Sequence, residues 1–103
     1  MNFEWDEKKN KTNINKHGIS FLEASTVFLD EKGIIFDDEV HSVNEERFLL
    51  LGMSEKANLC MVVHCLRESD EIIRIISARK ATKMNQKHTT NIRKDGNNYE
   101  ERV

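Results

Sequence analysis

The sequence lacks proline, has only two cysteines and contains no long apolar run. A transmembrane helix needs about 20 predominantly apolar residues, so a membrane-spanning protein is excluded and no membrane partner is expected. The first residues hold neither a basic lead nor an apolar stretch, so we expect no signal peptide and a cytoplasmic location. The four histidines are scattered and the cysteines are not spaced for zinc, so we expect no metal and no cofactor.

Both cysteines, Cys60 and Cys65, fall within one apolar run. In a strand, this odd spacing places their side chains on opposite faces, which excludes a disulfide between them. We therefore expect two buried, reduced thiols.

Positive charge is scarce overall, because the net charge is −2, but it is concentrated near the C-terminus. Segment 31–58 contains seven acidic and three basic residues. Segment 79–94 contains no acidic residue and six basic ones: Arg79, Lys80, Lys83, Lys87, Arg93 and Lys94. Such a segment is a candidate phosphate-binding surface, although a solvated basic helix is the commoner explanation of a lone charge run.

The length of 103 residues is enough for one domain with a modest core. Capping residues predict a first helix from Asp6 to Gly18 and a second that begins at Ser20 and ends near Asp30. Apolar runs separated by polar turns predict four strands, at 33–36, 47–52, 59–66 and 71–79. A short third helix is expected at 83–88.

The short connections between the last three strands predict an antiparallel meander. The expected fold class is therefore α+β: two N-terminal helices, a four-stranded mainly antiparallel sheet with helices on one face, and a short C-terminal helix. We expect residues 1–88 to form a single domain, and the polar residues 89–103 have the composition of a disordered tail.

Basic residues on the last two predicted strands are the first candidates for a functional site. Arg74 lies between isoleucines, and an unpaired charge in an apolar core is too costly, so it must face solvent, meet a carboxylate or line a site. Arg67 and Arg79 stand at strand ends, and Lys80 follows. Strict alternation would place Arg74 and Arg79 on opposite faces. Guanidinium groups bind phosphate bidentately, so these residues form a candidate phosphate-binding cluster.

Other titratable residues allow two further interpretations. His64 is the only histidine within a predicted strand, where it is either a partly buried structural residue or an acid–base catalyst. His17 fits the end of the first helix. A second possibility is a divalent cation site formed by Asp37, Asp38, Glu39 and His41. The spacing of these residues matches no known metal-binding loop.

Several ordered runs cover residues 3–82 and together form a specific pattern. They are Phe3-Glu4-Trp5-Asp6-Glu7-Lys8-Lys9, Asn13, Lys16-His17-Gly18-Ile19-Ser20-Phe21, Glu23-Ala24, Val27-Phe28-Leu29-Asp30, His41-Ser42, Glu45-Glu46-Arg47-Phe48, Gly52, Arg67 and Arg74-Ile75-Ile76-Ser77-Ala78-Arg79-Lys80-Ala81-Thr82. This pattern resembles the BrnT family of toxins from type II toxin–antitoxin systems.

The resemblance implies a compact fold similar to RelE-type ribonucleases, and a toxin that cleaves RNA and stops growth. It also implies a cognate ribbon-helix-helix-like antitoxin, a toxin–antitoxin heterotetramer, and contact with operator DNA only through the antitoxin. The family ends in Ala-Thr-x-x-Glu-x-x-x-Tyr-Glu. Here Asn85 and Thr89 occupy the glutamate and tyrosine positions, and Tyr99-Glu100 follows ten residues late.

From the cationic cluster we predict metal-independent cleavage, in which the ribose 2′-hydroxyl attacks the adjacent phosphorus and leaves a 2′,3′-cyclic phosphate. Arg67, Arg79 and Lys80 would stabilise the phosphate, and His64 would act as the acid or base. Arg74 would either stabilise the phosphate as well or bind a carboxylate, Glu71 or Glu46. Lys83 and Lys87 would bind RNA. The alternatives are a non-catalytic module that binds nucleic acid or protein, and a metal nuclease using the acidic cluster around His41.

Overall fold

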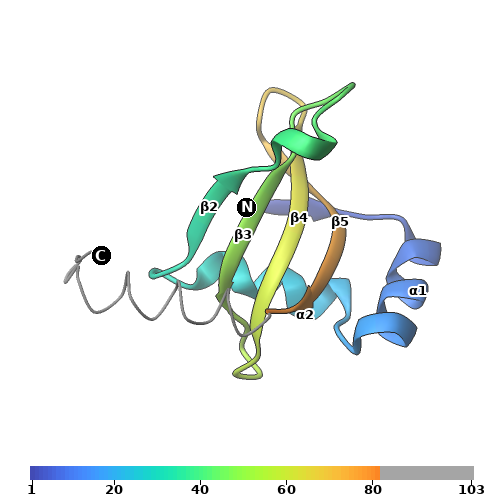
Figure 1. Cartoon of the computed structure of the whole chain (residues 1–103), viewed down its shortest axis with the longest axis vertical. Coiled ribbons are helices and arrows are strands. Elements are labelled where there is room, and N and C mark those ends of the chain that lie inside the picture. Colours follow the sequence, from blue (N-terminus) through green and yellow to red (C-terminus); the bar gives the residue numbers. More distant parts are fainter. Residues whose placement is uncertain (82–103) are drawn as a thin grey trace.

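The computed structural model describes residues 1–81, which form two helices and a five-stranded mixed sheet with the strand order β1-β5-β4-β3-β2 (Figure 1). The elements are β1 (Asn2–Glu4), α1 (Glu7–His17), α2 (Phe21–Thr26), the 3-10 turn η1 (Val27–Leu29), β2 (Ile34–Asp37), the 3-10 turn η2 (Glu39–His41), β3 (Phe48–Met53), β4 (Leu59–Arg67) and β5 (Ile72–Lys80). The α+β class and the two helices are confirmed. The helix predicted at 83–88 and the tail at 89–103 lie outside the described residues.

The prediction of a four-stranded sheet is wrong, because the N-terminal segment adds a fifth strand. Residues 2–4 pair in parallel with β5, so that Phe3 aligns with Ile73 and Glu4 with Arg74. Strands β2 to β5 pair antiparallel in sequence order, which confirms the predicted meander. A three-residue strand is too short to show an alternating pattern, so the sequence carries no signal for β1.

The predicted helix caps are present. The side chain of Asp6 accepts hydrogen bonds from the backbone N–H groups of Lys8 and Lys9, and Gly18 ends α1 with a φ of 72°, a conformation that glycine adopts without strain. Ser20 caps α2 by accepting from the N–H of Glu23. These caps leave only a short turn between the helices, which turns the chain back onto the sheet.

Helix α1 carries little apolar surface and is held to the sheet by a buried amide. The Nδ2 group of Asn13 donates to the carbonyls of Ile19 and Ala78 at 2.8 and 2.7 Å, and its Oδ1 accepts from the N–H of Ala78 at 3.1 Å. One side chain thus satisfies three buried backbone groups that would otherwise be costly to leave unpaired.

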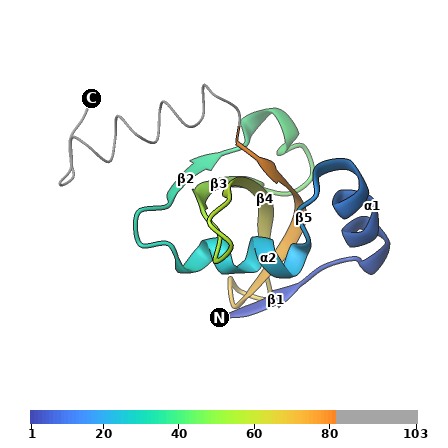
Figure 2. The same cartoon turned by 90° about the horizontal axis from the view of Figure 1, so that it is seen from below.

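One face of the sheet, called the helix-covered face below, packs against α2 and η1 (Figure 2). Its buried core is Ile19, Phe21, Ala24, Val27, Leu50, Cys60, Val62, Ile75 and Ala78. Phe3, Trp5 and Phe28 pack against this core, which anchors β1 and the entry to α1. Neither helix within residues 1–81 is long and apolar enough to cross a membrane.

Candidate active site

A bulge in β5 decides which face its arginines occupy. Val63 of β4 aligns with Ser77, but the next residue, His64, aligns with Ile75, so Ile76 is an extra residue in β5. Arg74 aligns with Cys65, and Arg79 aligns with Met61. Because Cys65 and Met61 lie four residues apart on a regular strand, their partners share one face.

The prediction that Arg74 and Arg79 lie on opposite faces is therefore wrong. Both lie on the face away from α2, called the opposite face below, and Arg67, two residues after Cys65, lies on it too. The three guanidinium groups that the sequence singles out follow one side of the sheet, because the bulge reverses the alternation between Arg74 and Arg79.

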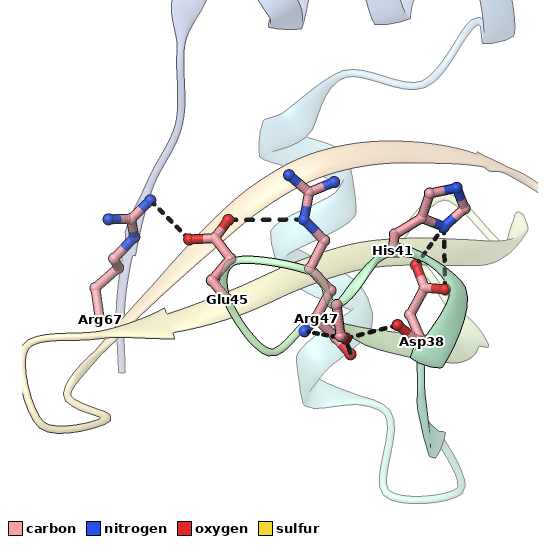
Figure 3. A network of polar contacts seen from close by, with 6 residues as sticks. Asp38, His41, Glu45, Arg47 and Arg67 are labelled. Carbon is pink, nitrogen blue, oxygen red and sulfur yellow. Dashed lines mark hydrogen bonds and ion pairs between the residues drawn. The ribbon is translucent and has the colours of Figure 1, made fainter.

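Two of these arginines are engaged by carboxylates. Nη1 of Arg74 donates to Oε2 of Glu4 at 2.8 Å, which ties β5 to β1. Nη2 of Arg67 lies 3.3 Å from Oε1 of Glu45, and the second oxygen of Glu45 lies 3.6 Å from Nε of Arg47 (Figure 3). The partners proposed for Arg74 from the sequence, Glu71 and Glu46, are thus replaced by Glu4. The pairing of β1 with β5 brings that carboxylate within reach.

Lys80 does not join the arginines. It aligns with the buried Cys60, so it lies on the helix-covered side of the sheet, and its charge acts on Glu23. Glu23 is buried, which opposes its ionisation, but hydrogen bonds from Asn58 and Ser54, with the charges of Lys56 and Lys80, hold its pKa below the usual value. Both donors lie 2.7 Å from Oε2 of Glu23. The carboxylate therefore ties α2 to the turn between β3 and β4.

His64 is also on the helix-covered face and is 3% exposed. Its ring lies between those of Phe28 and Phe48, with centroid distances of 4.8 and 5.8 Å, and its Nδ1 contacts the carbonyl of Val62 at 3.4 Å. Burial lowers the pKa of His64, more than the hydrogen bond to Val62 raises it. Because so little of the His64 side chain reaches the surface, its placement favours the structural alternative over the predicted acid–base role.

The cysteines are buried free thiols, as predicted. Burial, together with the nearby negative charge of Glu23, raises the pKa of Cys60 to about 11. A thiol that stays protonated at neutral pH is a poor nucleophile, so Cys60 has a packing role.

A pocket of about 320 Å³ lies on the opposite face. Its apolar floor comes from the strands, namely Leu49, Met61 and Val63. Around this floor stand two guanidinium groups, Arg47 and Arg79, and the pair formed by Asp38 and His41. Arg79 is the only residue of the predicted cationic cluster among those that line this pocket. Lys83 and Lys87 lie outside the described residues.

The imidazole of His41 is oriented by a carboxylate. Its Nδ1 lies 3.0 and 3.1 Å from the two oxygens of Asp38, whose side chain is 9% exposed, whereas the His41 side chain is 65% exposed (Figure 3). A carboxylate at Nδ1 favours the tautomer with the proton on that atom, which leaves Nε2 as a proton acceptor. Such a pair, placed beside two arginines, can transfer a proton next to a bound phosphate.

The chain holds Asp38, His41 and Arg47 together through Ser42. The Ser42 hydroxyl donates to the carbonyl of Asp38 at 2.6 Å and accepts from the N–H of Arg47 at 2.9 Å, and the N–H of Asp38 donates to the carbonyl of Arg47. These bonds close the segment between β2 and β3 into a compact loop over one end of the sheet. Figure 3 shows the terminal nitrogens of Arg47 beyond the Nε that faces Glu45.

The predicted alternative of a cation site at residues 37–41 gains no support from this geometry. Asp38 and His41 form a pair, while Asp37 and Glu39 are exposed. No group of three or more His, Cys, Asp or Glu side chains within residues 1–81 is arranged to hold a metal ion.

The Asp38–His41 pair and Arg47 were not assigned to the phosphate-binding cluster from the sequence alone. The signal was present, because His41-Ser42 and Glu45-Glu46-Arg47-Phe48 belong to the runs that resemble the BrnT family. The sequence does not show which of these residues contact one another, because the pairing of His41 with Asp38 depends on the turn η2.

A family profile described as "Ribonuclease toxin, BrnT, of type II toxin-antitoxin system" matches residues 5–85. The chain belongs to the BrnT family. The predicted identity, enzyme class and toxin function are confirmed at this level: it is a ribonuclease toxin of a type II system, which implies a cognate antitoxin.

The fold is similar to that of another BrnT protein. The crystal structure of the Brucella abortus ribonuclease toxin BrnT matches with a TM-score of 0.62 and 25% sequence identity, over 81% of this chain and 99% of that chain. Comparison with curated protein sequences finds no significant match.

Proposed function

We propose that this BrnT toxin is a metal-independent endoribonuclease that cuts RNA through attack of the ribose 2′-hydroxyl. The observation that carries the proposal is the pocket in which the Asp38–His41 pair stands beside Arg47 and Arg79. This route needs a proton acceptor and fixed positive charge around the phosphate, and the pocket contains both.

The residues of the pocket divide between two tasks. His41 accepts the proton of the 2′-hydroxyl at Nε2 while O2′ bonds to phosphorus, and Asp38 orients the ring through Nδ1. Arg47 and Arg79 stabilise the added charge on the phosphate oxygens. The bond from phosphorus to O5′ then breaks and that oxygen takes a proton from water, which leaves a 2′,3′-cyclic phosphate and a 5′-hydroxyl, while His41 returns its proton to the solvent.

The other predicted site residues are assigned more distant roles. Arg67 and Arg74 lie on the same face as Arg79 but hold Glu45 and Glu4, so we assign them to the positive field that orients the RNA strand. Lys80 and His64 belong to the other face and are left out of the chemistry. RNA binding by Lys83 and Lys87 stays a prediction from the sequence.

Family membership also supports the partners expected from the sequence. We assign the toxin a ribbon-helix-helix-like antitoxin, assembly with it as a heterotetramer, and contact with operator DNA only through that antitoxin. Cleavage of cellular RNA would then stop translation and growth when the antitoxin is lost.

The proposal is tested by the ends that the purified chain leaves on RNA. We expect 2′,3′-cyclic phosphate and 5′-hydroxyl ends at the same rate with and without EDTA. Loss of cleavage with EDTA, restored by Mg²⁺ or Mn²⁺, would replace this mechanism with metal hydrolysis. Tight binding of RNA that stays intact, by a chain that also fails to arrest growth, would favour the non-catalytic module.

A further inference from the structure

A second depression, called the α1 groove below, lies between α1 and the bulge of β5. It has a volume of about 270 Å³ and is lined on the helix side by Lys8, Lys9, Lys16 and His17, together with Thr12. The sheet side of the groove includes the bulge residues Ile76 and Ser77. Three lysines and a histidine thus surround one groove that contains a single large apolar side chain.

The α1 groove adjoins the pocket proposed for cleavage. Ile76 and Ser77 line both depressions, so no other strand separates them. Figure 2 shows α1 beside β5 at the edge of the sheet. The bulge therefore forms a shared wall between the proposed cleavage site and the lysines of α1.

The charge of the groove is uncompensated by ion pairs within residues 1–81, since the four pairs formed there involve none of its cations. The acids at the start of α1 are engaged elsewhere. Asp6 caps the helix, and Glu7 accepts hydrogen bonds from Trp5 and Asn10. Positive groups gathered in this way on one side of a chain with net charge −2 form a local electrostatic footprint for an anion.

The chemistry of the groove favours an RNA strand over a protein partner. The buried centre of a protein interface is typically rich in aromatic side chains and depleted of lysine, whereas this groove has the reverse composition. A phosphodiester strand cut in the neighbouring pocket continues on both sides of the cleaved bond and carries one negative charge per nucleotide.

We infer that the α1 groove binds backbone phosphates of the substrate RNA that flank the cleaved phosphodiester, through Lys8, Lys9 and Lys16. The position of the cleaved bond rests on the proposed function, but phosphate binding by the groove does not. The contacts are to the backbone and therefore add affinity without sequence preference.

The test uses the full chain with Lys8→Gln, Lys9→Gln and Lys16→Gln combined, and a matched control, Lys11→Gln. Lys11 is exposed on the same helix but does not line the groove. Glutamine is uncharged, polar and has a helix propensity close to that of lysine, and the substituted positions are exposed, so both variants should fold. Two substrates are compared: a single-stranded oligoribonucleotide and a dinucleoside monophosphate, which has no flanking phosphate.

For the triple variant, we expect KM for the oligoribonucleotide to rise about ten-fold, with kcat and all kinetics on the short substrate unchanged. The slope of log KM against log salt concentration should fall by about 2, because each lost contact to a single strand removes about 0.7. Lys11→Gln should behave as the unaltered chain. Equal losses on both substrates, or no loss on either, would overturn the inference.

A binding measurement keeps the inference testable if no cleavage is found. A fully 2′-O-methylated oligonucleotide cannot be cut by 2′-hydroxyl attack, and its Kd is measured by fluorescence anisotropy. We expect the triple variant to bind it about ten-fold more weakly than the Lys11→Gln control. Equal affinities would overturn the inference, as would unchanged RNA binding together with weaker binding of the antitoxin, which would assign the groove to a protein.

Discussion

The two faces of the sheet use the same kinds of polar residue for different purposes. On the helix-covered face, Asn13, Glu23 and His64 are at most 5% exposed, and each is bonded within the protein. On the opposite face, His41 and Arg79 line a solvent-open pocket, and the bonded side of His41 orients it outward. A polar group that is buried and bonded inside the protein stabilises the fold, whereas an exposed group held by a partner on one side is available to a substrate.

Arg67 and Arg74 occupy a middle position between these two cases. They lie on the opposite face, and their side chains are 45% and 31% exposed, but each holds a carboxylate. Half-exposed ion pairs contribute little stability, because solvent screens them. Removal of Arg67 or Arg74 should therefore disturb folding less than loss of Glu23, and activity less than loss of Arg79.

The largest effect is expected at His41. In His41→Asn, the amide can still donate to Asp38 but cannot transfer a proton, so RNA cleavage should fall by about 10²–10⁴. Single-turnover kinetics on RNA measure this loss, and the melting temperature should stay the same.

Glu39→Gln is the matched control, because Glu39 is exposed on the same turn and does not line the pocket. It should cleave at the unaltered rate. A loss in Glu39→Gln as large as in His41→Asn would instead favour the metal site suggested by the acidic sequence around it.

The next effect is expected at Arg79. Arg79→Gln removes a positive charge from the pocket and should lower kcat/KM by about 10²–10³. Arg79→Lys keeps the charge but loses the planar guanidinium group, so its activity should lie between that of the unaltered chain and that of Arg79→Gln. Arg74→Gln should lose much less activity, since that guanidinium is bound to Glu4. Equal losses at Arg74 and Arg79 would remove the distinction between the arginine bound to Glu4 and the arginine that lines the pocket.

A smaller effect, on stability alone, is expected at Glu23. Glu23→Ala leaves the buried Ser54 hydroxyl and the Asn58 amide without their acceptor, which should lower the free energy of unfolding by about 1–3 kcal/mol. Glu55→Ala, an exposed change in the same turn, should have no measurable effect. Urea unfolding measures both, and the cleavage rate per folded molecule should be unchanged in each.

The smallest effect is a dependence of stability on pH. Because the pKa of His64 is lowered in the folded chain, the unfolded chain binds more protons below about pH 6.5. Stability should therefore fall as the pH drops below that value, and His64→Leu should flatten this part of the profile. Glu23, whose pKa is also lowered, acts in a separate window below its ordinary value of 4.5. Identical profiles for both chains above that window would contradict the buried, neutral state of His64.

Much of the fold could be predicted from the sequence because its signals are local. Asp6, Gly18 and Ser20 mark helix ends through contacts a few residues away, and the apolar runs locate β2 to β5 within one residue. The strand β1 could not be predicted, because three residues carry no periodic pattern and its pairing with β5 spans about seventy residues.

The candidate site was predicted only in part, for a related reason. Arg79 was identified by its charge at a strand end, but its face depends on the bulge at Ile76, which alternation cannot reveal. The pairing of Arg74 with Glu4 depends on β1, and the exposure of His41 against the burial of His64 depends on which face α2 covers. These are tertiary properties, and residue type alone does not encode them.

The extra residue Ile76 determines which face of the sheet each later side chain of β5 occupies. Without it, every later residue of β5 would exchange sides, so that the small methyl of Ala78 would point toward the pocket and a guanidinium would be forced among Phe21, Val27 and Val62. Shortening the strand by this one residue, with no chemical group of the site altered, would therefore abolish both the packing and the proposed contact with phosphate.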